Sequence, residues 1–267
     1  MNFIVFKYYR CLFSLLITIA LSSSSFAQQA GFIDYKKWKL VIPVASSKGD
    51  ASEISGKKIK KCGKKDKRYK QFFKINSNNT IELRAKCTGV NEEGSFQLGE
   101  GQYSATEFVE LVGEKGKSYW SNVGNHVLKT RMKCYKVEGV PETYVARIVG
   151  LNNEDSTPVD KLRVFWKDGY ILAEVYEEYY GGVRYKKTRI GEVGENMFSL
   201  KLHVTNGNYY VSVKCERLNL SKKDVFLVKF PNTEATTNQF RVGNYYKNDQ
   251  NESDGISVQI KYIDLKH

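Results

Sequence analysis

The chain has 267 residues and a formal net charge of +13, and no stretch beyond its first 27 residues is long and apolar enough to span a bilayer. We therefore expect a soluble mature protein that has no membrane as partner. A basic exported protein attracts polyanions, but charge alone does not distinguish acidic polysaccharide from anionic lipid or nucleic acid.

The N-terminus has the three parts of a secretory signal peptide. Lys7 and Arg10 supply positive charge, Cys11–Leu21 is a short apolar run, and Ser25-Phe26-Ala27 places small residues at a cleavage site. We expect residues 1–27 to be removed and the protein to be secreted, or periplasmic in a bacterium; a membrane anchor is the alternative. No linker or repeat divides residues 28–267, so one domain is predicted.

A dense basic run, Lys57–Lys70, follows the first predicted strands. We expect a solvated surface loop there. A docking edge for a polyanion is the second interpretation. A nucleic-acid-binding arm is the weakest one, because few aromatic residues interleave for base stacking. Only the residues from Gln71 to Phe73 indicate a short helical turn.

Most of the mature sequence alternates apolar and polar residues with a period of two, which is typical of strands with one buried face. Asp168-Gly169, Gly181-Gly182 and Asn206-Gly207 supply hairpin turns. Many such strands without intervening helices predict an all-β jelly roll, a sandwich of two antiparallel sheets with a concave cleft. The clearest alternating segments are residues 162–166, 171–175, 198–204, 209–213 and 256–262.

Four cysteines, Cys62, Cys87, Cys134 and Cys215, remain after the signal peptide. An even number in an oxidising compartment predicts two disulfides. Cys62–Cys87 and Cys134–Cys215 are the favoured pairs, because each joins segments expected to be neighbours; four buried free thiols are the alternative.

Several kinds of site are excluded by their motifs. Gly113–Ser118 resembles a phosphate-binding loop, but its first required glycine falls at Leu111. There is no Gly-x-Ser-x-Gly nucleophile elbow. No group of Cys and His residues has metal-site spacing, so we predict no metal and no cofactor.

Four segments, in order along the chain, resemble the motifs of one known family. Asp34–Pro43 (DYKKWKLVIP) resembles that family's D-x-x-x-W-K-L-x-x-P strand, and Thr106–Leu111 (TEFVEL) lies where the family has R-S-E-L-R-E. Ala146–Gly150 (ARIVG) lies at G-Q-I-H-G, and Phe240–Tyr246 (FRVGNYY) matches Y-F-K-A-G-x-Y from its second position. The ordered set resembles polysaccharide lyase family 7, the alginate lyases. This resemblance covers nearly the whole mature chain and implies a jelly roll acting on a uronic-acid polysaccharide.

The sequence departs from the family at its catalytic motifs. Ala105 and Val109 replace the two arginines of R-S-E-L-R-E, while Glu107 keeps the first glutamate. Arg147 replaces the family's glutamine, and Val149 replaces its histidine. In the last motif the lysine is Arg241 and the first tyrosine is Gln239, whereas the final tyrosine is kept as Tyr245.

Period-two geometry predicts a site on one sheet face. Val145, Arg147 and Val149 would share a strand face, and Gly243 would leave room for a sugar beside Arg241 and Tyr245. Arg147 could neutralise a substrate carboxylate through two parallel hydrogen bonds, and a nearby guanidinium favours an ionised tyrosine. We expect Glu107 to hold an arginine in place. The catalytic candidates are Tyr245 and Arg147, and the substrate-binding candidates are Arg241, Arg131, Gln239 and Glu107.

The resemblance and the charge together predict a monomeric lyase that cleaves an anionic polysaccharide, alginate or another uronan, by β-elimination. The alternative is a lectin-like jelly roll that binds such a polymer without cleaving it. A secreted protein for another polyanion is a more remote interpretation. His126 and His203 are expected to be structural.

Overall fold

The computed structural model describes residues 33–46, 51–67, 69–85, 102–111, 119–135, 142–151, 158–179, 182–233, 236–248 and 256–267. The expected signal peptide lies outside these residues, as does Cys87. Residues 32–267 form one compact unit. Among the described helices, none has the length and apolar character needed to cross a membrane.

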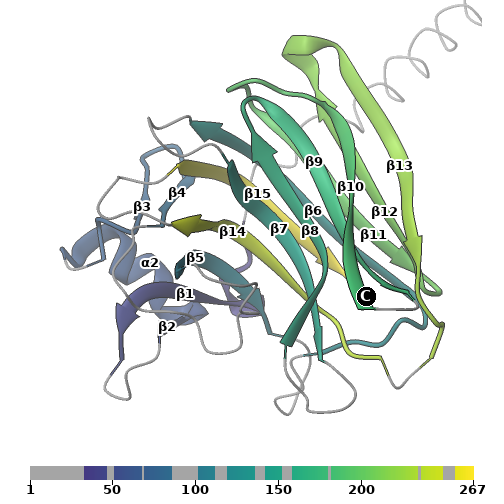
Figure 1. Cartoon of the computed structure of the whole chain (residues 1–267). Coiled ribbons are helices and arrows are strands. Elements are labelled where there is room, and N and C mark those ends of the chain that lie inside the picture. The colour runs from purple at the N-terminus through teal and green to yellow at the C-terminus, as the bar shows by residue number, and fades with distance from the viewer. Residues whose placement is uncertain are drawn as a thin grey trace, which may run out of the picture. The chain divides into compact units, whose positions relative to one another are not determined.

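Two antiparallel sheets build this unit, which confirms the predicted β-sandwich jelly roll (Figure 1). The larger sheet has the order β10-β9-β8-β7-β14-β5-β1-β2, and the smaller has the order β13-β12-β11-β6-β15-β4-β3. The strands are β1 Trp38–Ala45, β2 Ala51–Ser55, β3 Phe73–Ile75, β4 Ile81–Arg84, β5 Gln102–Glu110, β6 Asn125–Tyr135, β7 Glu142–Leu151, β8 Pro158–Lys167, β9 Tyr170–Tyr179, β10 Gly182–Glu192, β11 Phe198–Thr205, β12 Asn208–Cys215, β13 Leu220–Lys229, β14 Gln239–Asn248 and β15 Ser257–Lys266. The helical elements are η2 Tyr35–Lys37, α2 Gly56–Lys65 and η3 Glu216–Leu218.

Two of the predicted hairpins form with the expected turn chemistry. Asp168 and Gly169 have φ angles of 46° and 88° between β8 and β9, and Asn206 and Gly207 have 47° and 78° between β11 and β12. Left-handed φ at both central positions defines the turn that matches strand twist. Strands β9 and β10 also pair, with Gly182 opposite Tyr179, while Gly181 lies outside the described residues.

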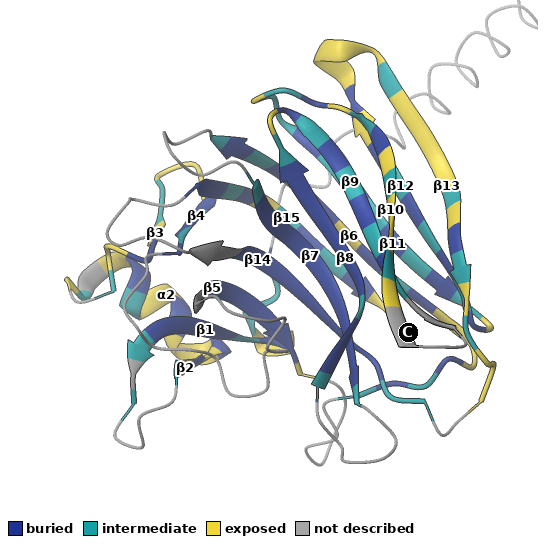
Figure 2. Cartoon of the chain, viewed as in Figure 1, coloured by how far each residue is buried: buried dark blue, intermediate teal, exposed yellow. Residues whose placement is uncertain are grey.

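Apolar side chains of both sheets meet in one core between the layers, with contributions from every part of the described chain. Figure 2 shows the central strands β7, β8 and β14 as buried, whereas α2 and much of β13 are exposed. Alternation places one face of each strand in this core. The opposite face of the large sheet carries the polar side chains considered below.

Bulges change the face assignment at three points where strict alternation was expected. An irregularity of the β7–β8 pairing puts Val145 in the core beside Ala146, so the expectation that Val145 shares a face with Arg147 is wrong. A second one, at Lys161, turns Asp160 to the same face as Arg163. In β15 a shift after Ile260 leaves Tyr262 half-buried. Each extra residue reverses the alternation beyond it.

Part of the basic run is a helix and not the expected loop. Helix α2 covers Gly56–Lys65 and buries Ile59 and Gly63 against the body of the protein. An ideal Cβ at Gly63 would lie 2.9 Å from the ring of Phe73, so a side chain there would separate the helix from β3. The helix therefore forms because it packs one narrow face, with its lysines turned outward.

The predicted disulfide between Cys134 and Cys215 is wrong: both residues are buried free thiols, and Cys62 is free as well. Cys134 lies on β6 and Cys215 on β12, and β11 separates these strands. Two strand spacings amount to about 9–10 Å, whereas a disulfide needs Cα atoms closer than about 7 Å.

We expect iodoacetamide to modify Cys62 in the folded, unreduced protein and to spare Cys134 and Cys215. Cys62 is half-exposed, and burial raises the pKa of the Cys134 thiol well above its usual range, with a smaller contribution from Glu195. After unfolding in urea without reductant, all three should be alkylated, as read by peptide mass spectrometry. A peptide pair cross-linked through Cys134 and Cys215 would contradict this.

Candidate functional site

The candidate site lies on the face of the large sheet turned away from the core, which we call the site face. Neighbouring residues of β5, β7 and β14 point alternately into the core and onto this face; Phe108, Ala146 and Val242 are in the core. The polar residues between them are nevertheless almost completely buried. The principal members of the site face are Glu107, Tyr144, Arg147, Asp160, Arg163, Arg241 and Tyr245.

Arg147 is at the centre of this face and binds two carboxylates. Its Nε donates to Glu107 Oε1 at 3.0 Å, its Nη2 donates to Glu107 Oε2, and its Nη1 donates to Asp160 Oδ1 at 3.1 Å. All three residues are at most 3% exposed. The guanidinium nitrogens are thus engaged within the protein, and this geometry does not support the expectation that Arg147 holds a substrate carboxylate.

The same guanidinium lies over the ring of Tyr245, with 3.9 Å between Arg147 Cζ and the ring centroid. Tyr245 is 2% exposed and packs with Ala105, Tyr144 and Phe165 in a small apolar cluster separate from the main core. A cation at this distance is attracted by the ring quadrupole. Arg147 therefore fixes the position of the tyrosine and places positive charge beside it.

A second arginine extends the network along β8. Arg163 Nε donates to Asp160 Oδ2 at 2.8 Å, and its Nη2 donates to the hydroxyl of Tyr185 at 3.3 Å. Burial by itself would raise the pKa of Asp160, but Arg147, Arg163 and Arg241 together hold it below its usual range. Asp160 is consequently a carboxylate and not a proton donor near neutral pH.

The contacts of Arg241 to Gln239 and Glu107 are longer than those of Arg147 to Glu107 and Asp160. Arg241 Nε lies 3.3 Å from Gln239 Oε1 and its Nη1 lies 4.0 Å from Glu107 Oε2, while Gln239 donates to the carbonyl of Glu110. Gly243 does not make room for a sugar as expected, because a Cβ there would lie 2.4 Å from the carbonyl oxygen of Thr106. The glycine allows β14 and β5 to approach.

The fold has counterparts among known proteins. The family model described as "Alginate lyase" matches residues 33–267, which is nearly all of the chain. The chain belongs to the alginate lyase family. The resemblance inferred from the four sequence segments is thereby confirmed. No curated protein sequence matches the chain.

Solved alginate lyases share the fold. The family-7 enzyme A1-II′ is 18% identical, with a TM-score of 0.66 over 88% of this chain and 96% of its own. Alginate lyase PA1167 from Pseudomonas aeruginosa is 18% identical, with a TM-score of 0.66 over 88% and 99%. The enzyme from Corynebacterium sp. is 20% identical, with a TM-score of 0.62 over 88% and 96%. At these identities the match is one of fold.

Five of the six predicted site residues meet on the site face of this family member; the sixth does not. Arg131 lies on β6 in the smaller sheet, where its side chain is 36% exposed and 3.9 Å from Glu216. Its direction away from the core was predicted correctly, but the sheet assignment was wrong. Alternation shows which side of a strand a residue takes and not which sheet holds the strand.

Neither Val149, at the family's histidine position, nor His126 nor His203 supplies an imidazole to this face. Val149 is buried and lies opposite Gln239 and Asp160. His126 stacks on Trp120, with ring centroids 4.3 Å apart, and its Nε2 bonds to the carbonyl of Val123. His203 lies beside Asn125 and Asp224 in the smaller sheet.

Asp160 and Arg163 were missed by the sequence reasoning, although they complete the network around Arg147. Arg163 follows the alternation of Leu162 and Val164 and was therefore available from the pattern. Asp160 was not, because without the bulge at Lys161 it would share the core face with Leu162. Whether a carboxylate is buried depends on the tertiary structure and cannot be predicted from the local sequence.

We expect Asp160→Asn to lower the free energy of unfolding most at neutral pH. Because the pKa of Asp160 is depressed in the folded state, its stabilisation is present above the unfolded pKa of about 3.9 and is lost as pH falls through the folded value. Urea unfolding between pH 7 and pH 3 should show the difference between wild type and variant narrowing below about pH 4. A difference that stays constant over this range would contradict the assignment.

Proposed function

We propose that the protein is a secreted polysaccharide lyase that cleaves a uronic-acid polymer, alginate or a related uronan, by β-elimination. The observation that carries this proposal is the Arg147 guanidinium placed over the Tyr245 ring on the site face of an alginate lyase fold. Two structures of A1-II′ variants support the substrate class. One is a tyrosine-to-phenylalanine variant in complex with product (GGG), and the other is a double variant in complex with substrate (GGMG).

β-Elimination sets three chemical requirements. A base must remove the proton on C5, next to the uronate carboxylate, and an acid must protonate the C4 oxygen as its bond to C4 breaks. The negative charge that develops towards the carboxylate must also be stabilised. The product keeps a C4=C5 double bond, and no water is consumed.

The site face supplies a candidate for each requirement. Tyr245 is the proton-transfer group: as a tyrosinate its oxygen takes the C5 proton, and the resulting hydroxyl gives a proton to the leaving oxygen. Arg147 acts as a positioning residue that keeps positive charge against this ring. Arg241 is the candidate for the substrate carboxylate, since its contacts to Gln239 and Glu107 are long compared with those of Arg147.

One set of observations favours a second function, binding without cleavage. Val149 provides no proton acceptor at the histidine position of the family, and the nitrogens of Arg147 are committed to Glu107 and Asp160. A protein with this face and no competent proton-transfer group would hold an acidic polysaccharide and leave it intact.

Incubation with polymannuronate, polyguluronate and glucuronan separates the two functions. The unsaturated product of elimination absorbs in the near ultraviolet, because its double bond is conjugated with the carboxylate. A lyase gives a steady rise in absorbance with at least one polymer. Retarded migration in a gel containing the polymer, with no rise in absorbance, would overturn the lyase proposal and leave the binding function.

A further inference from the structure

We infer that α2 is a cationic docking surface that holds the anionic polysaccharide beyond the site face. This inference rests on the proposed function and says which surface of the protein binds the polymer outside the site face. Gly56 to Lys67 contain seven lysines and one aspartate, a local net charge of +6 in a chain of +13. Helix α2 presents most of these lysines to solvent on one packed, fixed element (Figure 2).

The site face itself offers little net attraction to an anion. Its buried arginines, Arg147, Arg163 and Arg241, face Glu107, Asp160 and Glu174, and Glu174 also pairs with Lys187. Because these charges largely offset one another, cations elsewhere on the protein add to the long-range attraction of a polyanion.

Five lysines of Gly56 to Lys67 have no carboxylate partner within the described part of the chain. Among the described residues, Lys57, Lys58, Lys61, Lys64 and Lys67 form no ion pair. Six lysines of the sheets form such pairs, whereas Lys222, Lys223 and Lys229 on β13 do not; the pairs are Lys39–Glu53, Lys74–Glu82, Lys167–Glu142, Lys187–Glu174, Lys201–Asp224 and Lys214–Glu216. Unpaired like charges fixed on one helix remain available to an external polyanion.

This charge arrangement acts against the stability of the helix. No acidic residue lies in its first turn, Ser55 makes no side-chain capping bond, and Lys57 and Lys58 stand at the positive end of the helix dipole. Lysines three and four residues apart repel each other as well. A bound anion would relieve both effects.

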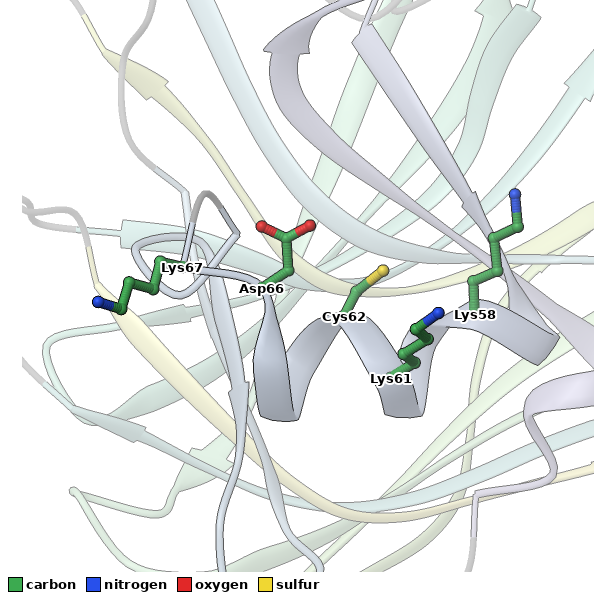
Figure 3. Close-up of a pocket in the computed structure, with 5 residues that line it drawn as sticks. All are labelled: Lys58, Lys61, Cys62, Asp66 and Lys67. Atoms are coloured by element: carbon green, nitrogen blue, oxygen red, sulfur yellow. The ribbon is translucent and has the colours of Figure 1, made fainter.

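A pocket of about 510 Å³ opens along α2 and its C-terminal end. Figure 3 shows its lining residues, with the Lys58 ammonium, the Cys62 thiol and the Asp66 carboxylate rising on the same side of the helix. Lys61 and Lys67 complete the lining. Within the helix, Lys58 and Lys64 are six positions apart, about 9 Å along its axis, so its cations spread over nearly two turns.

The helix begins at the edge of the large sheet and packs against β3 of the smaller sheet. Strand order runs β14-β5-β1-β2, and α2 begins directly after β2 at the edge of the sheet (Figure 1). Three strand spacings separate β14 from β2, about 14 Å. A polymer bound near Tyr245 and crossing these strands would pass the sheet edge at which α2 begins.

The test is the triple variant Lys58→Glu/Lys61→Glu/Lys67→Glu. Its matched control, Lys222→Glu/Lys223→Glu/Lys229→Glu, makes the same charge change on exposed positions of β13, in the other sheet. We expect the α2 variant to bind each polymer that wild type binds at least tenfold more weakly in affinity electrophoresis at low salt, and the β13 variant to stay within twofold. For a polymer that wild type cleaves, the α2 variant should have a higher KM, and this increase should be smaller for short oligosaccharides.

Binding is measured without turnover, so the inference and the lyase proposal fail separately. If the α2 variant binds the polymer more weakly than wild type and neither protein yields an ultraviolet-absorbing product, the docking inference is supported and the lyase proposal is not. An equal loss in both variants would overturn the inference, as would a selective α2 effect on phosphatidylserine vesicles or a DNA oligomer but not on the polysaccharide. The neutral triple variant Lys58→Gln/Lys61→Gln/Lys67→Gln should show a smaller loss of polymer affinity. Circular dichroism checks that this variant is folded.

Discussion

Replacing Tyr245 by phenylalanine is expected to reduce the lyase rate about 10²–10⁴-fold, the usual loss for a general acid–base group. The ring remains and so does its packing with Tyr144 and Phe165 under the Arg147 guanidinium. Only the hydroxyl, which would exchange the proton, is removed. The measurement is initial rate by near-ultraviolet absorbance on the best polymer, together with a urea unfolding curve to show that the fold is intact.

Tyr210→Phe is the matched control, since it removes a hydroxyl from β12 in the smaller sheet and should leave the rate unchanged. If Tyr245→Phe kept most of the activity, Tyr245 would not be the proton-transfer group. His126 would not be the next candidate, because it is stacked on Trp120. Lys161 would be, since burial lowers its pKa to about 8 and it donates to the carbonyl of Thr237, two residues before Gln239.

Replacing Arg147 by methionine is expected to lower the free energy of unfolding by about 3–5 kcal/mol, the cost typical of breaking a buried ion pair on one side. Methionine fills part of the same space but leaves Glu107 and Asp160 without their shared cation. Urea unfolding at pH 7 measures the loss. Any surviving variant should also lose activity, because Tyr245 no longer has a positive charge on its ring.

Lys167→Met supplies the control on the same two strands. Lys167 on β8 pairs with Glu142 on β7 at 3.1 Å, with both side chains partly exposed, and such pairs contribute about 0–1 kcal/mol. The double variant Glu107→Gln/Arg147→Met should cost less than the sum of its single variants, since it removes one of the two carboxylates that Arg147→Met leaves without this cation. Equal losses for Lys167→Met and Arg147→Met would show that the Arg147 network carries no special stability.

The sequence alone was sufficient for the fold class, because alternation and paired turn residues are local signals. Asp168-Gly169 and Asn206-Gly207 adopt left-handed φ angles at the two central positions of their hairpin turns. The alternating segments on either side of these turns can bury their apolar face only in a sheet. Ordered motifs then identified the family. They also brought Tyr245, Arg147, Arg241, Gln239 and Glu107 together, since β14, β7 and β5 keep their order.

The tertiary structure decided what those residues do. Whether Arg147 faces a substrate or two carboxylates depends on Asp160, and Asp160 reaches the site face only through a bulge at Lys161. Arg131 points away from the core as alternation requires, yet it belongs to the other sheet. Cys134 and Cys215 lie two strands apart for the same reason. Strand order, bulges and helix packing arise from contacts distant in sequence, so a local pattern of residues cannot specify them.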